Sequence, residues 1–142
     1  MPVSVVGADT ALGAAVLEAV LAPAREVRAF VSNRDVAPTL RSRGIKVAVG
    51  DVSDGSHVAA VCWGAHTVIL ITDAAFDDRE LAFVNDPAGL VPVWVEAARG
   101  ARRVVWVGKH LGSLPPASIE VRDDGRSLAE IASYVAALDE AG

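Results

Sequence analysis

The segment that follows the first apolar run contains residue types that bind phosphate groups. It reads Gly7-Ala8-Asp9-Thr10-Ala11-Leu12-Gly13 and joins the run Val3–Val6 to a helical pattern that begins at Ala11. Gly7 allows a tight turn after a strand, and Gly13 allows the helix to pack close to a sheet. Backbone N–H groups from Ala8 to Leu12, helped by the positive end of the helix dipole, then attract a pyrophosphate. The segment therefore predicts a dinucleotide-binding turn.

The same segment departs from the usual glycine pattern in two ways. Its middle glycine is replaced by Thr10 or by Ala11, depending on the spacing that is compared. Asp9 adds a carboxylate at the helix N-terminus, where it would repel a phosphate unless it turned away. Alternatively, Asp9 or Thr10 caps the helix and the phosphate site is degenerate. The choice between a working site and a scaffold that binds no cofactor stays open at this point.

Polar residues after the second apolar run, Val27–Val31, bear on the kind of dinucleotide. Ser32, Asn33 and Arg34 follow that run. An acid at this place favours NAD, whereas an arginine can hold the 2′-phosphate of NADP with two hydrogen bonds. Arg34 thus favours NADP, although it can equally be a solvated side chain at a helix start.

Two later runs end in polar residues that can line the same cleft. Thr72 and Asp73 follow the run Thr67–Ile71, and Lys109 and His110 follow Arg103–Val107. Lys109 can meet a nicotinamide ribose or a phosphate, and His110 can transfer a proton near neutral pH. The alternative is a solvated loop after a buried strand. We take Lys109 and His110 as the candidate catalytic residues, and Thr72 and Asp73 as candidate cofactor contacts.

These candidates share a cleft only if the apolar runs form one sheet. The runs are short, rich in Val and Ile, and alternate with helical patterns, which predicts parallel strands joined by helical crossovers. We expect a doubly wound Rossmann-type α/β domain over residues 1–142, with strand order 3-2-1-4-5 and a sixth strand beyond the fifth. The predicted strands are Val3–Val6, Val27–Val31, Ile45–Val49, Thr67–Ile71, Arg103–Val107 and the weaker Ser118–Val121.

The helices between these strands are predicted from apolar spacing and from capping residues. Asp35 and Asp54 stand where the N-caps of the second and third helices belong. The last helix has apolar residues at helical spacing. The predicted helices with clear ranges are Ala11–Leu21, Leu90–Arg99 and Leu128–Leu138.

Composition excludes several classes of function. The net charge is −5, and like charges do not cluster, so nucleic-acid binding is disfavoured. No apolar stretch is long enough to cross a membrane and no targeting peptide is visible, so we expect a cytoplasmic protein. Cys62 is expected to be a small buried hydrophobe. His57 and His66 lack further ligands at suitable spacing, so no metal site is expected.

Four blocks of sequence resemble the short-chain dehydrogenases/reductases, especially the extended and atypical group of NmrA-like NAD(P)-binding proteins. The blocks are VVGADTALGAAVLEAVL, EVRAFVSNRD, RSRGIKVAVGDVSD and AHTVILIT, and the similarity covers roughly residues 3–108. The resemblance implies that Asp51 accepts a hydrogen bond from the adenine amino group and that Val52 packs nearby.

The resemblance also shows which catalytic groups are missing. Family enzymes usually carry Tyr-x-x-x-Lys, in which the tyrosine transfers the proton. The only tyrosine here is Tyr134, and Leu138 stands four residues later. The family's serine after the fifth strand is replaced by Gly108-Lys109-His110. Complete members are also much longer, so the chain looks like a cofactor half without its substrate half.

Two functions are compatible with these features, besides the scaffold without cofactor. One is a non-catalytic dinucleotide-binding or redox-sensing module. The other is a minimal NAD(P)H-dependent oxidoreductase that reduces a small acceptor such as a quinone or an enone, for which cofactor and orientation can suffice.

Self-association is a further expectation from the sequence. The helix around Trp94, with Val91 and Val95, can form a homodimer interface about a two-fold axis. Alternatively, Trp94 packs on the sheet.

Overall fold

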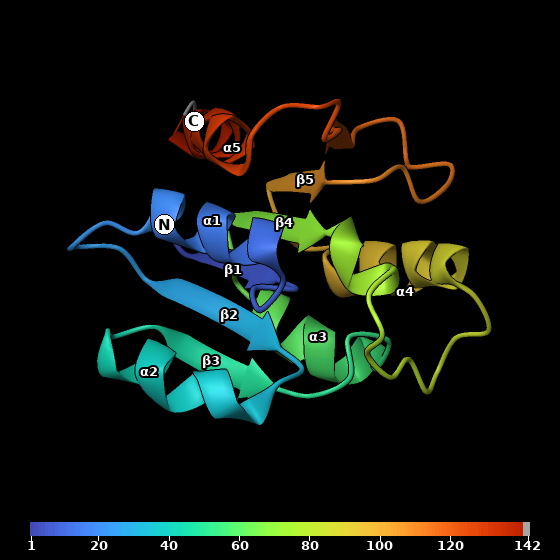
Figure 1. The fold of residues 1–142 in the computed structure, drawn as a ribbon, viewed down its shortest axis with the longest axis horizontal. Coiled ribbons are helices and arrows are strands. Elements are labelled where there is room, and N and C mark those ends of the chain that lie inside the picture. The colour runs from blue at the N-terminus through green and yellow to red at the C-terminus, as the bar shows by residue number, and fades with distance from the viewer. Residues whose placement is uncertain (141–142) are drawn as a thin grey trace.

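Parallel strands form one sheet in the order β3-β2-β1-β4-β5-β6 (Figure 1). The computed structural model describes residues 1–140. The predicted doubly wound order, with the sixth strand beyond the fifth, is confirmed. The central strand β1 pairs with β2 on one side and with β4 on the other, so the strand order reverses at β1. The strands are β1 (Val3–Val6), β2 (Val27–Val31), β3 (Lys46–Val49), β4 (Thr67–Ile71), β5 (Arg103–Val107) and β6 (Ile119–Val121).

Helices cover both faces of this sheet. Figure 1 shows α5, near the C-terminus, beside α1, and these two helices are in contact; α3 and α4 contact each other in the second layer. The α-helices are α1 (Ala11–Val20), α2 (Ala37–Ser42), α3 (Gly55–Cys62), α4 (Leu90–Ala97) and α5 (Leu128–Glu140). Short 3-10 turns lie at η1 (Arg34–Val36), η2 (Thr72–Ala75) and η3 (Pro87–Gly89).

The strand β4 shows why the sheet reads as continuous apolar runs. All five of its residues are buried. Ile69 and Ile71 pack with α1 and α5, whereas Val68 and Leu70 pack with α3 and α4. Both faces of a strand covered on each side by helices must be apolar, so the alternation of polar and apolar residues disappears.

The ends of several elements differ from the prediction. Asp35 is not an N-cap, because Asn33 caps η1 by accepting from the backbone N–H of Asp35 at 2.9 Å, and α2 starts only at Ala37 without a side-chain cap. Asp54 does cap α3, as predicted, and accepts from the N–H of His57. The fourth helix ends at Ala97, earlier than expected, while the last helix continues to Glu140.

Trp94 lies inside the protein and not on its surface. Its side chain is fully buried, its indole N–H donates to the carbonyl of Val52 at 2.8 Å, and its ring lies 6.0 Å from that of Trp106. The sheet-packing alternative is therefore confirmed. Trp94 itself is not available for a dimer contact, because its whole side chain is buried between α4 and the sheet.

Cys62 is buried, as predicted. Burial raises the pKa of its thiol to about 12, so the thiol is protonated and unreactive at neutral pH. Between residues 1 and 140 no helix is both long and apolar enough to cross a membrane. Within that same range, no group of three metal-ligating side chains comes together.

Candidate functional site

The glycines of the turn are required by the packing between β1 and α1. Gly7 has φ +85°, a conformation that side-chain-bearing residues rarely adopt. A Cβ atom on Gly13 would lie 2.0 Å from the carbonyl oxygen of Gly7. The helix N-terminus therefore sits directly against the end of the central strand, at the point where the strand order reverses. That crevice is where ligands bind in doubly wound folds.

Thr10 is the N-cap of α1, as one of the two alternatives had it. Its Oγ1 accepts from the N–H of Gly13 at 2.8 Å and donates to the carbonyl of Gly7 at 2.9 Å. The hydroxyl of Thr10, which replaces the middle glycine, therefore bonds within the turn, to Gly7 and Gly13. Among residues 1–140, the N–H groups of Ala11 and Leu12 have no hydrogen-bond partner, as is usual in a first helical turn. These two groups are donors that could hold a pyrophosphate oxygen.

Asp9 turns away from the helix N-terminus and toward the end of β2. Its Oδ2 accepts from the backbone N–H groups of Ser32 and Asn33, both at 2.9 Å. Its Oδ1 lies 2.9 Å from Nη1 of Arg79, and only 5% of its side chain is exposed. The repulsion that Asp9 would exert on a phosphate is thus neutralised within the protein.

These contacts also set the ionisation of Asp9. Burial raises the pKa of the carboxyl, but the N–H of Asn33, the guanidinium of Arg79 and the N–H of Ser32 together outweigh burial and hold the pKa below its ordinary value. Asp9 is therefore ionised at neutral pH, and it forms an ion pair with Arg79 that water hardly reaches.

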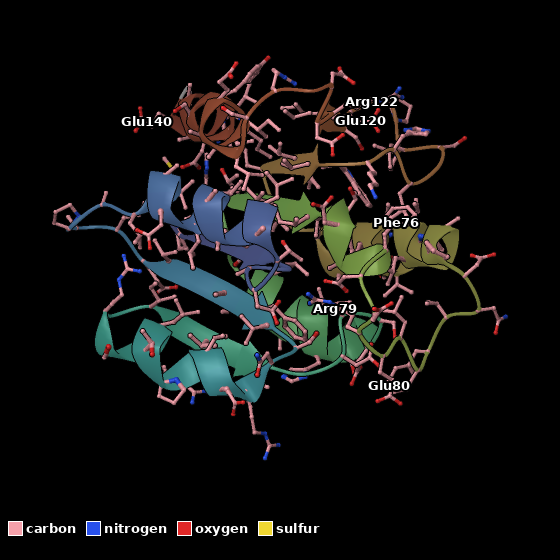
Figure 2. All side chains as sticks on the ribbon, in the orientation of Figure 1. Phe76, Arg79, Glu80, Glu120, Arg122 and Glu140 are labelled. Atoms are coloured by element: carbon pink, nitrogen blue, oxygen red, sulfur yellow. The ribbon has the colours of Figure 1, made fainter. Side chains whose placement is uncertain are left out.

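Arg79 is the site residue that the sequence analysis missed. It belongs to the loop after η2, and Figure 2 shows it near the end of β2. Its Nη1 also donates to Oγ of Ser32 at 3.2 Å, and its Nε and Nη2 donate to the two carboxylate oxygens of Asp77, each at 2.6 Å. No local pattern could have found this pairing, because Arg79 and Asp9 are 70 residues apart in the chain.

A cavity of about 590 Å³ opens beside this ion pair. We call it the acidic pocket, since five carboxylate side chains line it together with a single arginine. Arg34, the sequence-based candidate for a 2′-phosphate, is exposed on η1 and is not part of the lining. The acidic pocket is lined by Asp9, Ser32, Asn33, Gly50, Asp51, Asp77, Asp78, Arg79 and Glu80.

Asp51 lines the acidic pocket and also anchors the loop after β4. Its Oδ1 accepts from the N–H and the Oγ–H of Ser53, and its Oδ2 accepts from the N–H of Ala82 at 2.7 Å. The adenine contact expected for Asp51 stays a prediction, and it would use the remaining lone pair of Oδ2. Val52 is fully buried in the core, so its packing near an adenine also remains a prediction.

A second group of polar residues lies at the same edge of the sheet, where β4 and β5 end; we call Thr72, Asp73, Gly108 and Lys109 the β4–β5 junction. Gly108 has φ +117°, and a Cβ there would lie 2.7 Å from both Thr72 Oγ1 and Asp73 Oδ1. Thr72 donates to the carbonyl of Val107 at 3.2 Å. The structure therefore brings Thr72 and Asp73 against the end of β5, with Lys109 near Asp73, whereas His110 does not join them.

Asp73 differs from Asp9 in its hydrogen bonding and in the direction of its pKa shift. Its Oδ1 is buried and has no hydrogen-bond partner among the described residues. Burial, followed by the negative charge of Asp123, raises the pKa of Asp73, and Lys109 opposes that rise only in part. The ammonium of Lys109 itself lies 5.3 Å from the ring centre of Phe76, which Figure 2 shows beyond the end of β4.

His110 turns its ring toward β6. Its Nδ1 lies 2.6 Å from a carboxylate oxygen of Glu120 and 3.2 Å from Nη2 of Arg122, and Figure 2 shows those two side chains together. The ring is thus held by surface charges, although it follows Lys109 directly in the chain. Tyr134 lies half-exposed on α5.

Known proteins place this geometry in context. A family model described as NAD(P)H-binding matches residues 7–138, which is most of the chain. No curated protein matches the sequence.

Solved structures similar to this chain include several reductases. Triphenylmethane reductase from Citrobacter sp., complexed with NADP(H), has a TM-score of 0.62 and 22% identity; the match covers 98% of this chain and 46% of the reductase. The NADPH-dependent quinone oxidoreductase from Escherichia coli, complexed with NADPH, has a TM-score of 0.59 and 21% identity, with 98% and 45% covered. This chain therefore spans about half the length of these two enzymes.

Another similar structure is matched over most of its own length. The anaerobillin reductase from Escherichia coli O157:H7 has a TM-score of 0.57 and 19% identity, and the match covers 99% of this chain and 91% of that protein. At such identities the likeness demonstrates a shared fold. The family match, together with the glycine turn and the sheet order, shows that this chain belongs to the NAD(P)H-binding family of Rossmann-type domains.

Proposed function

We propose that the chain binds a nicotinamide dinucleotide across the carboxyl edge of its sheet and works as a binding or redox-sensing module. The proposal rests on the hydrogen bonding within the glycine turn. Ala11 and Leu12 offer free N–H groups, while the carboxylate of Asp9 is directed away from them. The adenosine part would lie toward the acidic pocket and the nicotinamide toward the β4–β5 junction.

A minimal oxidoreductase is the second candidate, and Asp73 favours it. A bound NAD(P)H supplies a hydride, and a quinone or enone that accepts the hydride must also gain a proton. Asp73 has a buried oxygen without a partner among the described residues and a raised pKa, so it is a candidate for exchanging that proton near the place where the acceptor would lie. Lys109 and His110 remain the candidate catalytic residues from the sequence, Lys109 for positioning and His110 for proton transfer.

Cofactor binding is tested by titrating the tryptophan fluorescence with NADPH and, separately, with NADH. The sharpest variant is Ala11→Pro. Ala11 is the first residue of α1, where proline is tolerated, so the change removes one free N–H and keeps the helix. Leu128→Pro is the matched control at the first residue of α5. We expect saturable binding at micromolar concentrations that Ala11→Pro weakens about tenfold or more and Leu128→Pro leaves unchanged.

Two results would contradict the binding module. No binding at millimolar nucleotide would leave a scaffold as the better description. Equal binding by wild type and Ala11→Pro would remove the pyrophosphate from the glycine turn. Loss of binding in Gly7→Val, with the helical circular dichroism retained, would give independent support.

The oxidoreductase alternative is tested by following NADH or NADPH oxidation with a quinone acceptor. Activity that falls in Asp73→Asn, Lys109→Ala or His110→Ala would establish an enzyme and identify its residues. Activity that is unchanged in all three variants would remove the site assignment. No turnover in a protein that binds the nucleotide would favour the sensing module.

Further properties of the chain stay proposals from the sequence. We propose one domain over residues 1–142, a cytoplasmic location, a small-molecule substrate if the protein is an enzyme, and no nucleic-acid binding. A homodimer through α4 would have to use Val91 and Val95, since Trp94 is buried. A monomeric mass in light scattering at micromolar concentration would rule that dimer out.

A further inference from the structure

We infer that Asp9 makes this site discriminate against the 2′-phosphate that distinguishes NADP(H) from NAD(H), an inference that rests on the proposed dinucleotide binding. The residue that selects the cofactor thus comes from the glycine turn itself. In the usual arrangement, the selecting acid or base stands at the end of the second strand.

The first argument concerns the hydrogen-bond donors at the end of β2. The adenosine ribose of a Rossmann-type domain lies at this place, so a 2′-phosphate would need donors here. Three donors converge: the N–H of Ser32, the N–H of Asn33 and Nη1 of Arg79. All three already contact the carboxylate of Asp9, at 2.9 Å each. Asp9 therefore acts as an internal anion in the position that a 2′-phosphate would take.

The second argument concerns the charges around that position. The two other nitrogens of Arg79 are bound by Asp77, so its charge is shared between two carboxylates. Asp51, Asp78 and Glu80 add further negative charge to the same wall. A phosphate carrying about two negative charges would enter this acidic pocket against strong repulsion. No second cation in the lining offsets that repulsion, within the part of the chain that the structure describes.

A ribose hydroxyl meets the opposite situation. Among the described residues, Oδ1 of Asp9 has a hydrogen bond from Arg79 alone, so one of its lone pairs is left. The carboxylate of Asp77 is 41% exposed. Both groups can accept a hydrogen bond from a 2′-hydroxyl, which only the dinucleotide without the 2′-phosphate carries. The geometry thus favours NADH over NADPH, contrary to the preference that Arg34 suggested.

Calorimetric titration of NADH and NADPH into wild type, Asp9→Ala, Asp9→Asn and Asp78→Ala tests this inference. Wild type should bind NADH about tenfold or more tightly than NADPH. Asp9→Ala frees the three donors and should shift the ratio about tenfold or more toward NADPH. Asp9→Asn keeps an acceptor for the two N–H groups and removes the charge, so it should shift the ratio less. Asp78→Ala, which removes a charge from the same wall, should change the ratio less than about threefold.

The outcomes separate the inference from the proposed function. Wild-type binding of NADPH as tight as that of NADH overturns the selection by Asp9 and leaves dinucleotide binding intact. An unchanged ratio in both Asp9 variants, with unfolding transitions like that of wild type, also overturns it. Binding of neither nucleotide by wild type would instead overturn the proposed function.

Discussion

The acidic pocket and the β4–β5 junction each contain an aspartate with a buried carboxylate oxygen at the carboxyl edge of the sheet, and their pKa values shift in opposite directions. In the acidic pocket, Asp9 has two backbone N–H groups and the guanidinium of Arg79 around its carboxylate. At the β4–β5 junction, Asp73 has an oxygen without any partner among the described residues and the negative Asp123 nearby. Burial raises the pKa in both, yet the final shift is downward for Asp9 and upward for Asp73.

In this pair, the hydrogen-bond donors and charges around the carboxylate decide the direction of the pKa shift, since burial raises the pKa of both. Asp9 is a fixed anion that holds Arg79 and the end of β2 together, so it contributes structure and selection. Asp73 exchanges a proton more easily, so it is the group with chemical capacity. Under the proposed function, recognition would belong to the acidic pocket and proton transfer to the β4–β5 junction.

The largest effect is expected at the glycine turn, which lies between the acidic pocket and the β4–β5 junction. Gly13→Ala would place a methyl group 2.0 Å from the carbonyl oxygen of Gly7. We expect the free energy of unfolding, measured in urea, to fall by about 4 kcal/mol. Gly100→Ala is the matched control, because a Cβ there has open space, and it should be nearly neutral. Equal effects in both variants would show that the turn does not depend on close packing.

The next largest effect is expected for Arg79→Ala. The change leaves Asp9 as a buried charge without its cation, and the free energy of unfolding should fall by about 2 kcal/mol. Because the folded pKa of Asp9 is lowered, its favourable contribution is complete above the pKa of an unfolded aspartate. It is lost as the pH falls through the lower folded pKa. Urea unfolding at several pH values measures both effects.

The double variant Asp9→Ala with Arg79→Ala sharpens this prediction. Removing both partners should cost less than the sum of the two single changes. If the loss of unfolding free energy in the double variant equalled the sum of the two single losses, the ion pair would not couple the glycine turn to the loop after η2. The contrast between a paired Asp9 and an unpaired Asp73 would then fail.

Asp73→Asn should change the free energy of unfolding in the opposite direction and by a smaller amount. The raised pKa means that the charged form of Asp73 is unfavourable in the folded protein, so its removal should raise the free energy of unfolding at neutral pH, by about 1 kcal/mol. The gain should shrink as the pH falls through the folded pKa and vanish below the pKa of an unfolded aspartate. A loss of stability at neutral pH would mean that the Asp73 carboxylate is better stabilised than its contacts indicate.

The smallest effect is expected for Glu120→Gln. Glu120 lies outside the acidic pocket and the β4–β5 junction. The Glu120 carboxylate pairs with the half-exposed His110 and Arg122, and such surface pairs contribute little. We expect a change of about 0.5 kcal/mol or less in urea unfolding. A larger loss would show that the His110 cluster supports the β4–β5 junction, and His110 would then belong with that junction.

The sequence was most informative about elements whose signal is local. The apolar runs of β1, β2, β4 and β5 predicted those strands with their observed bounds, because strands covered on both faces are mostly apolar. The pattern of Gly7 and Gly13 predicted the turn for the same kind of reason, since only glycine fits where the helix meets the strand. The cap predicted at Asp35 was wrong, because Asn33 accepts from the N–H of Asp35 and so places Asp35 inside the 3-10 turn η1.

Asp9 marks the limit of what the sequence determined. Its position in the glycine turn predicted a carboxylate near the phosphate site that would repel a phosphate unless it turned away, with a helix cap as the alternative. Only the tertiary structure decided that Thr10 is the cap and that Asp9 reaches the end of β2 and Arg79. The sequence determines which side chains are charged, but their partners depend on which loops the folded sheet brings together. Here the partners Asp9 and Arg79 are 70 residues apart in the chain.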